Sequence, residues 1–65
     1  MTMAKHTCPV CGQYQFEAWN DMDICEVCDW CNDGVQESKP DYCGGANHMS
    51  LNQAREAYKE GRQIR

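Results

Sequence analysis

Four of the six cysteines are spaced so that they can hold one metal ion. Cys8 and Cys11 form one Cys-x-x-Cys pair, Cys25 and Cys28 form a second, and thirteen residues separate the pairs. Two intervening residues let the backbone turn so that both sulfurs of a pair point the same way. Two such pairs supply a tetrahedral set of thiolates, with metal–sulfur distances of about 2.3 Å. The spacing therefore predicts a four-cysteine metal site.

The residues around the first pair favour such a turn more clearly than those around the second. Pro9 fixes φ and has no N–H to leave unpaired, and Gly12 allows a positive φ after the second sulfur. Glu26 and Asp29 stand at the corresponding positions of the second pair. Asp tolerates the left-handed region better than most residues, so we expect both turns to form.

Zinc is the ion that we expect, with one ion per chain in a structural role. A closed four-cysteine site leaves no coordination position for a substrate. Iron accepts the same four sulfurs, so a rubredoxin-like one-electron carrier is the alternative. Cys25, Cys28 and Cys31 also match part of a ferredoxin run, but the fourth cysteine and its proline are absent.

Two cysteines and two histidines remain outside this set. Acidic residues stand two positions to either side of Cys31, and nearby negative charge disfavours a reactive thiolate. His48 could replace a cysteine at the metal, but we expect it to be exposed before a helix, and we expect His6 in solvent. The sequence leaves open whether Cys31 and Cys43 join the site, pair with each other or stay free. It indicates no catalytic residues, so we expect a protein that is not an enzyme.

The chain is short and acidic. A single domain of 65 residues buries too little apolar surface to be comfortably stable without a metal or a disulfide. Between Glu17 and Asp41 there are eight acids and one base, Lys39. Nucleic-acid-binding proteins normally carry a positive face, so the net charge of −4 disfavours a nucleic-acid-binding zinc ribbon. We expect a protein partner instead, bound through the acidic middle segment and exposed aromatic residues. An adaptor, or an immunity-type inhibitor of a basic protein, fits that description.

No apolar stretch marks a secretory leader or a membrane span. Thiols stay reduced in the cytosol, where paired cysteines more often bind metal than form disulfides. We therefore expect a cytoplasmic protein.

Hydrophobic alternation predicts a short antiparallel hairpin. Residues 14–18 and 22–24 alternate apolar with polar side chains, and the turn-forming pair Asn20-Asp21 separates them. With one cysteine turn at each end of its open side, this hairpin would make a zinc ribbon, a small metal-stabilised α+β fold. The side chains expected to face the core are Tyr14, Phe16, Met22 and Ile24.

The second half of the chain predicts an irregular segment followed by one helix. Residues 29–49 show no periodicity, and we expect Trp30, Val35 and Tyr42 to pin them to the ribbon. Ser50 and Gln53 form a capping box and Gly61 ends the pattern, which predicts a C-terminal helix at about residues 50–60. Its apolar face would carry Leu51, Ala54, Ala57 and Tyr58.

These elements make one domain over residues 7–61, between a flexible N-terminus (1–6) and a basic C-terminal tail (62–65). Several short motifs keep their order and spacing along this domain. They are Cys8-Pro9-x-Cys11-Gly12, Ile24-Cys25-x-Val27-Cys28-x-Trp30, Asp33-Gly34-Val35-Gln36, Asp41-Tyr42, Gly44-Gly45-Ala46-Asn47 and Ser50-Leu51-Asn52-x-Ala54-Arg55.

On these motifs, the chain resembles the small bacterial cysteine-rich proteins called the CPCC family. It departs from them at Val10, where the family name expects a cysteine, and at Cys31, Cys43 and His48. The departure at Val10 removes a spare thiol from the first turn. The resemblance implies the fold, and it implies no particular activity.

Overall fold

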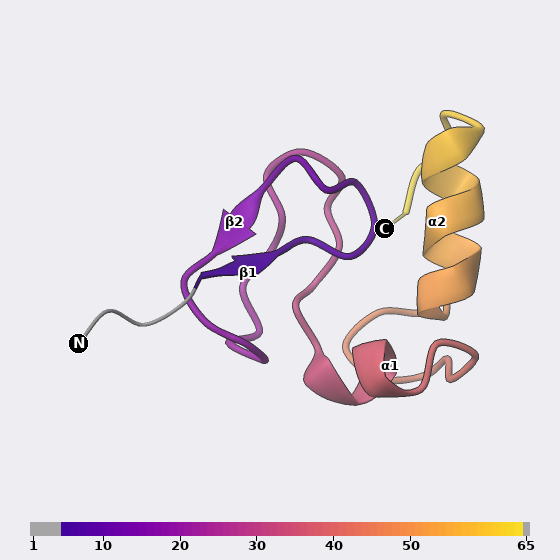
Figure 1. Cartoon of the computed structure of the whole chain (residues 1–65). Helices are drawn as coiled ribbons and strands as arrows, with labels where there is room; N and C mark the ends of the chain where they lie inside the picture. The colour runs from indigo at the N-terminus through magenta and orange to yellow at the C-terminus, as the bar shows by residue number, and fades with distance from the viewer. Residues whose placement is uncertain (1–4, 65) are drawn as a thin grey trace.

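A computed structural model describes residues 5–64 of the chain. Figure 1 shows α2 standing beside a small hairpin, with the C-terminal end of the chain returning between them. The elements in order are β1 (His6–Thr7), β2 (Gln15–Phe16), α1 (Gly34–Ser38) and α2 (Leu51–Lys59). A small α+β arrangement was expected, and the structure has one.

The hairpin is not the one predicted from the alternation. β1 pairs antiparallel with β2, with His6 opposite Phe16 and Thr7 opposite Gln15. This pairing encloses the first cysteine turn, so His6 belongs to a strand although the sequence assigned it to a flexible start. Residues 1–4 lie outside the described part of the chain.

Residues 22–24, predicted to pair with residues 14–18, pair instead with residues 30–32. The amide of Met22 donates to the carbonyl of Asn32 over 3.1 Å, and the amide of Asn32 donates to the carbonyl of Asp23 over 2.8 Å. A single antiparallel bridge joins Ile24 to Cys31. Each cysteine turn therefore closes its own short antiparallel pair. Alternation predicted which residues are extended but not their partners, because it carries no information on register between segments.

A small apolar core lies between the cysteine turns and α2. Phe16 and Trp30 are fully buried, and the partly buried Tyr14 packs against the same cluster. Ile24 is half-buried, but Met22, which was also expected to face the core, is 51% exposed. The backbone of Met22 has a positive φ of 60°, so it does not continue the regular alternation of a strand.

α2 begins and ends as the sequence predicts. Ser50 accepts a hydrogen bond from the amide of Gln53, and the Gln53 side chain accepts one from the amide of Ser50. At the other end Gly61 has φ of 74°, and the amide of Arg62 donates to the carbonyl of Ala57 over 2.7 Å. These contacts form a Schellman end.

The buried face of α2 differs from the prediction at one position. Leu51, Ala54 and Ala57 are buried, whereas Tyr58 is 40% exposed. Ile64 completes the core from beyond the helix. Residues 62–64 of the segment expected to be a basic tail therefore fold back onto the domain through this one apolar residue. Arg65 lies outside the described part of the chain.

The middle segment is held largely by polar side chains, and only one of the three side chains expected to pin it is buried. Trp30 is buried, but Val35 and Tyr42 are 54% and 45% exposed. The Nε2 of the fully buried Gln36 shares its two hydrogens among the carbonyls of three residues at 3.1–3.2 Å, and its oxygen accepts from the amide of Asn47 over 2.9 Å. The three carbonyls belong to Tyr42, Asn47 and Met49.

The short helix α1 was missed from the sequence, although a cap pattern precedes it. Asp33 caps the helix by accepting from the amide of Val35 over 2.9 Å. Its other oxygen accepts from the amide of Ala46 over 3.0 Å. Gly45 lies close by, and a Cβ at that position would be 2.7 Å from this carboxylate. The pattern Asp33-x-x-Gln36 is a capping signal of the kind that identified α2.

Within residues 5–64, no helix is long and apolar enough to cross a membrane.

Candidate metal centre

The first cysteine turn is closed by backbone hydrogen bonds at both ends. The amide of Cys8 donates to the carbonyl of Tyr14 over 2.8 Å, which joins the turn to the β1–β2 hairpin. The amide of Gly12 donates to the carbonyl of Cys8 over 3.0 Å, and Gly12 has φ of 68°. The left-handed glycine is what lets the chain leave Cys11 and return along β2.

The second turn repeats this bonding, except that its closing carbonyl lies five residues after the first cysteine rather than six. The amide of Cys25 donates to the carbonyl of Trp30 over 2.8 Å, and the amide of Asp29 donates to the carbonyl of Cys25 over 2.9 Å. Asp29 has φ of 71°, so it adopts the conformation that Gly12 adopts in the first turn. The two turns therefore share the bond between the first cysteine and the fifth residue of the turn, and the left-handed conformation of that residue, despite the aspartate.

The four predicted sulfurs converge on one point between the turns. The sulfurs of Cys8 and Cys28 are 3.6 Å apart, as are those of Cys11 and Cys25. All four lie within 4.8 Å of one another. A disulfide requires about 2.05 Å, whereas tetrahedral sulfurs around an ion at about 2.3 Å are separated by roughly 3.8 Å. The arrangement fits a shared metal ion and does not fit disulfides.

Backbone amides also point at the sulfurs. The amides of Val27 and Cys28 both donate to Cys25 Sγ over 3.4 Å, and the amide of Gln13 donates to Cys11 Sγ over 3.4 Å. Donors of this kind stabilise negative charge on sulfur. They compensate in part for four thiolates held so close together.

Burial controls the acidity of two of these thiols. It raises the pKa of Cys8 to about 11, and it also raises the pKa of Cys28. Burial acts in the same direction on Cys25, but the amides of Cys28 and Val27 help to outweigh it and the pKa of Cys25 falls below its ordinary value. At neutral pH a metal ion must therefore displace protons from Cys8 and Cys28.

The site is built into the core rather than placed on the surface. Cys8, Cys25 and Cys28 are buried in the same cluster as the apolar face of α2, and Cys11 is partly buried against it. The guanidinium Nε of Arg55 donates to the carbonyl of Pro9 over 2.8 Å, which ties α2 to the first turn. An ion held by these sulfurs would fix the turns that α2 packs against.

The other candidate residues stay outside this group. Cys31 is buried and its thiol donates to the carbonyl of Met22 over 3.4 Å, whereas Cys43 and His48 are exposed. Among the described residues, only the four predicted cysteines form a cluster with metal-ligand geometry. His6 is not in open solvent as expected, since its Nε2 lies 2.7 Å from Glu37 Oε1.

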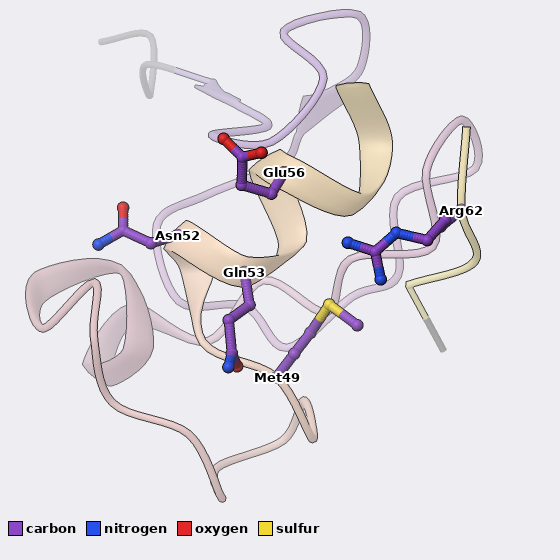
Figure 2. Close-up of a pocket in the computed structure, with 5 residues that line it drawn as sticks. All are labelled: Met49, Asn52, Gln53, Glu56 and Arg62. Atoms are coloured by element: carbon purple, nitrogen blue, oxygen red, sulfur yellow. The ribbon is translucent and has the colours of Figure 1, made fainter. Parts of the chain in front are cut away.

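A separate hollow of about 420 Å³ opens on α2. Figure 2 shows its lining, in which the Arg62 guanidinium points toward Met49 and the Glu56 carboxylate points away from both. The remaining lining residues are Asn52 and Gln53. The hollow contains no cysteine and no nucleophile paired with a base, so it adds no catalytic arrangement to the metal centre.

A family model described as cysteine-rich CPCC matches residues 6–61. The chain belongs to this family. The match covers both cysteine turns with their four clustered sulfurs, the polar middle segment and α2. No curated protein gives a significant match to the chain. This member of the CPCC family is thus a small cysteine-rich protein whose four clustered sulfurs are suited to a metal ion.

Proposed function

We propose that this protein binds one structural zinc ion through Cys8, Cys11, Cys25 and Cys28 and has no enzymatic activity. The observation that carries the proposal is the convergence of four sulfurs within 4.8 Å inside the apolar core. Four protein ligands complete the tetrahedral coordination of zinc and leave no position for a substrate. The ion would link the two cysteine turns and would not take part in a reaction.

The small size of the chain supports a structural role for the ion. The buried apolar cluster is small, and three of its members are the metal-site cysteines Cys8, Cys25 and Cys28. Structural zinc sites in small peptides contribute roughly 10–16 kcal/mol of apparent binding energy. That range exceeds the stability of most domains of this size, so zinc binding and folding would be one equilibrium.

The proposed role of the folded protein is to bind another protein of basic character. Residues 17–41 carry eight acids and one base; Trp19 in this stretch and Tyr42, directly after it, are 52% and 45% exposed. Acidic surroundings attract basic partners and exposed aromatic side chains anchor interfaces. An adaptor or an immunity-type inhibitor in the cytoplasm, where thiols stay reduced, fits these features.

A rubredoxin-like electron carrier is the second candidate, and one observation favours it. The two turns share a backbone hydrogen bond, and Asp29 adopts the left-handed conformation of Gly12. This similarity suits iron as well as zinc, because both ions accept four sulfurs in tetrahedral geometry. Iron in this site would give a coloured protein that bleaches on reduction.

Metal analysis and native mass spectrometry of the freshly purified protein separate the two candidates. One zinc per chain in a colourless protein supports the structural proposal. Stoichiometric iron in a red protein would replace it with electron transfer.

The partner class is tested with two displayed libraries of random peptides, one enriched in Lys and Arg and one in Asp and Glu. The zinc-loaded protein should select basic peptides, and their binding should weaken as salt is added. Equal selection from both libraries would contradict a basic partner.

A further inference from the structure

A loop that carries no metal ligand is held in place by side-chain hydrogen bonds. It spans residues 18–23 and lies between β2 and the second cysteine turn. The side-chain oxygen of Asn20 accepts from the amide of Gly34 over 2.7 Å. The side-chain amide of Asn32 donates to the carbonyl of Ala18 over 2.8 Å and to Asp21 Oδ1 over 2.7 Å. These bonds tie the loop to the start of α1.

The backbone of this loop is also strained. Asn20 and Met22 have φ of 59° and 60°, a region that residues other than glycine rarely adopt. Such conformations persist only where the surroundings fix them, and they cluster at functional sites. Here the strain and the hydrogen bonds accompany two large apolar side chains that point outward, Trp19 and Met22, which are 52% and 51% exposed.

The indole of Trp19 is exposed but held in place. A Cβ on Gly34 would lie 2.7 Å from Cζ2 of Trp19, so the ring rests directly on the backbone at the start of α1. The ring of His6 meets it edge-on at 5.4 Å between centroids, and His6 is in turn bonded to Glu37. A preorganised aromatic ring loses little conformational entropy on binding, which makes it a good interface anchor.

A hollow of about 290 Å³ opens beside this ring. Its apolar wall is formed by Trp19 and by Val35, which is 54% exposed. Its polar rim includes Asn20, Ser38 and Lys39. The lining thus comes from the loop and from α1, the two segments that the hydrogen bonds join.

Charge around this hollow indicates what it would accept. Residues 17–23 and 33–41, which contain its lining, carry six acids and one base. One acid, Asp33, is buried as a helix cap, and Glu17 pairs with Lys5 over 3.2 Å. Glu37 lies 2.7 Å from His6 Nε2, and the remaining three acids, Asp21, Asp23 and Asp41, are exposed. None of the acids lines the hollow itself, but they flank its lining residues along the chain.

We infer that the hollow between Trp19 and Val35 is the docking site for a basic peptide segment of a partner protein. An aliphatic or aromatic side chain of that segment enters the hollow, and Lys or Arg residues on either side of it meet the acids. The inference rests on the proposed protein-binding function and names the site that performs it. A second copy of this chain is a poorer occupant, because each copy carries a net charge of −4.

The test uses basic dodecapeptides selected by the zinc-loaded protein from a displayed library, measured against variants of the full chain. Trp19→Ala should weaken binding by about thirtyfold, as expected for a central anchor. Tyr58→Ala removes a comparably exposed aromatic side chain from α2 and should leave binding unchanged. Trp30 is the other tryptophan and is fully buried, so its fluorescence reports whether Trp19→Ala is folded.

Two further variants keep the test decisive if Trp19→Ala fails to fold. Val35→Ser should weaken binding by about threefold, since it makes the apolar wall polar. Lys39→Glu should strengthen binding by about threefold, because it removes the one base at the rim.

Selected peptides should carry an apolar residue between Lys or Arg residues, and the protein should sediment as a monomer. Peptides that bind all of these variants equally would overturn the site and leave the proposed basic partner standing. Failure to select basic peptides would overturn both. Dimerisation abolished by Trp19→Ala would assign the hollow to a second copy instead.

Discussion

Two segments of this small domain, called its first and second halves below, are stabilised by different means. Residues 6–31 form two similar turns whose four sulfurs meet inside the apolar core. Residues 32–50 contain a five-residue helix and irregular chain, organised around the buried side chains of Gln36 and Asn47. One half is suited to a metal ion and the other is held by a network of hydrogen bonds.

The difference shows that a chain with little apolar surface can be stabilised both by a metal site and by buried side-chain amides. A metal site gains a large free energy from few residues, but it fixes only the segments that carry the ligands. A buried amide gains less, yet each of its bonds fixes a different backbone group. The halves meet at Cys31, whose amide and carbonyl both bond to the Asn47 side chain over 2.8 and 3.0 Å.

Breaking the first half should have the largest effect. Cys25→Ser should abolish stoichiometric zinc binding and unfold the chain at 25 °C, because the site is expected to contribute most of the folding free energy. Circular dichroism and metal analysis measure both outcomes. The matched control is Cys43→Ser, which changes an exposed cysteine and should keep one zinc and the native fold. A folded, zinc-loaded Cys25→Ser protein would contradict the assignment of the ligand.

Breaking the second half should cost less and should spare the metal. Gln36→Met keeps the volume of the side chain but leaves the carbonyls of three residues without their donor. We expect a loss of about 3–5 kcal/mol in the free energy of unfolding, since buried unsatisfied groups cost about 1–3 kcal/mol each and partly relax. Zinc stoichiometry should stay at one. Gln63→Met, at an exposed position, is the control and should change stability by less than about 0.5 kcal/mol.

Lowering the pH should weaken zinc binding by the cysteines of the first half. Because burial raises the pKa of Cys8 to about 11 and raises that of Cys28, both thiols are protonated near neutrality unless a metal displaces the protons. Each bound zinc then releases at least two protons, so its apparent affinity should fall at least about hundredfold for each unit of pH decrease. The stability that zinc supplies is therefore lost as pH falls. Competition with a chromophoric chelator between pH 6 and 8 measures the slope, and a slope near zero would contradict the displacement of protons from these thiols by zinc.

The shared left-handed conformation of Gly12 and Asp29 predicts that substitutions at Asp29 change the free energy of unfolding less than the substitutions above. Asp29→Gly should change the free energy of unfolding by less than about 1 kcal/mol, because glycine relieves the positive φ but is more flexible in the unfolded chain. Asp29→Val should lower it by about 1–2 kcal/mol, since a β-branched residue tolerates that conformation poorly. Thermal unfolding of the zinc-loaded variants gives the comparison. A stable Asp29→Val protein would show that the turn can form without this conformation.

The features predicted correctly from the sequence are those that depend on neighbouring residues. The cysteine spacing identified the four sulfurs that converge, because the Cys-x-x-Cys turn is local and its geometry depends on neighbouring residues. The start and end of α2 were predicted for the same reason, from Ser50, Gln53 and Gly61. The hairpin partners were wrong because pairing between distant segments depends on tertiary contacts, which alternation does not encode.

The middle segment was the least predictable part. Val35 and Tyr42 were expected to be buried because of their apolar and aromatic side chains, yet both are exposed, and Gln36 and Asn47 are buried in this segment instead. A buried amide gives no periodic pattern, and its partners are mostly backbone carbonyls that any sequence provides. The cap pattern at Asp33 was the one local sign of α1, and the resemblance to the CPCC family marked these residues without explaining them.

X-ray absorption at the zinc edge of the purified, zinc-loaded protein tests the central claim most directly. Four sulfur ligands at about 2.3 Å, with one zinc per chain, are the predicted result. A nitrogen or oxygen ligand in the first coordination sphere, or fewer than four sulfurs, would contradict the assignment of Cys8, Cys11, Cys25 and Cys28 as a closed structural site.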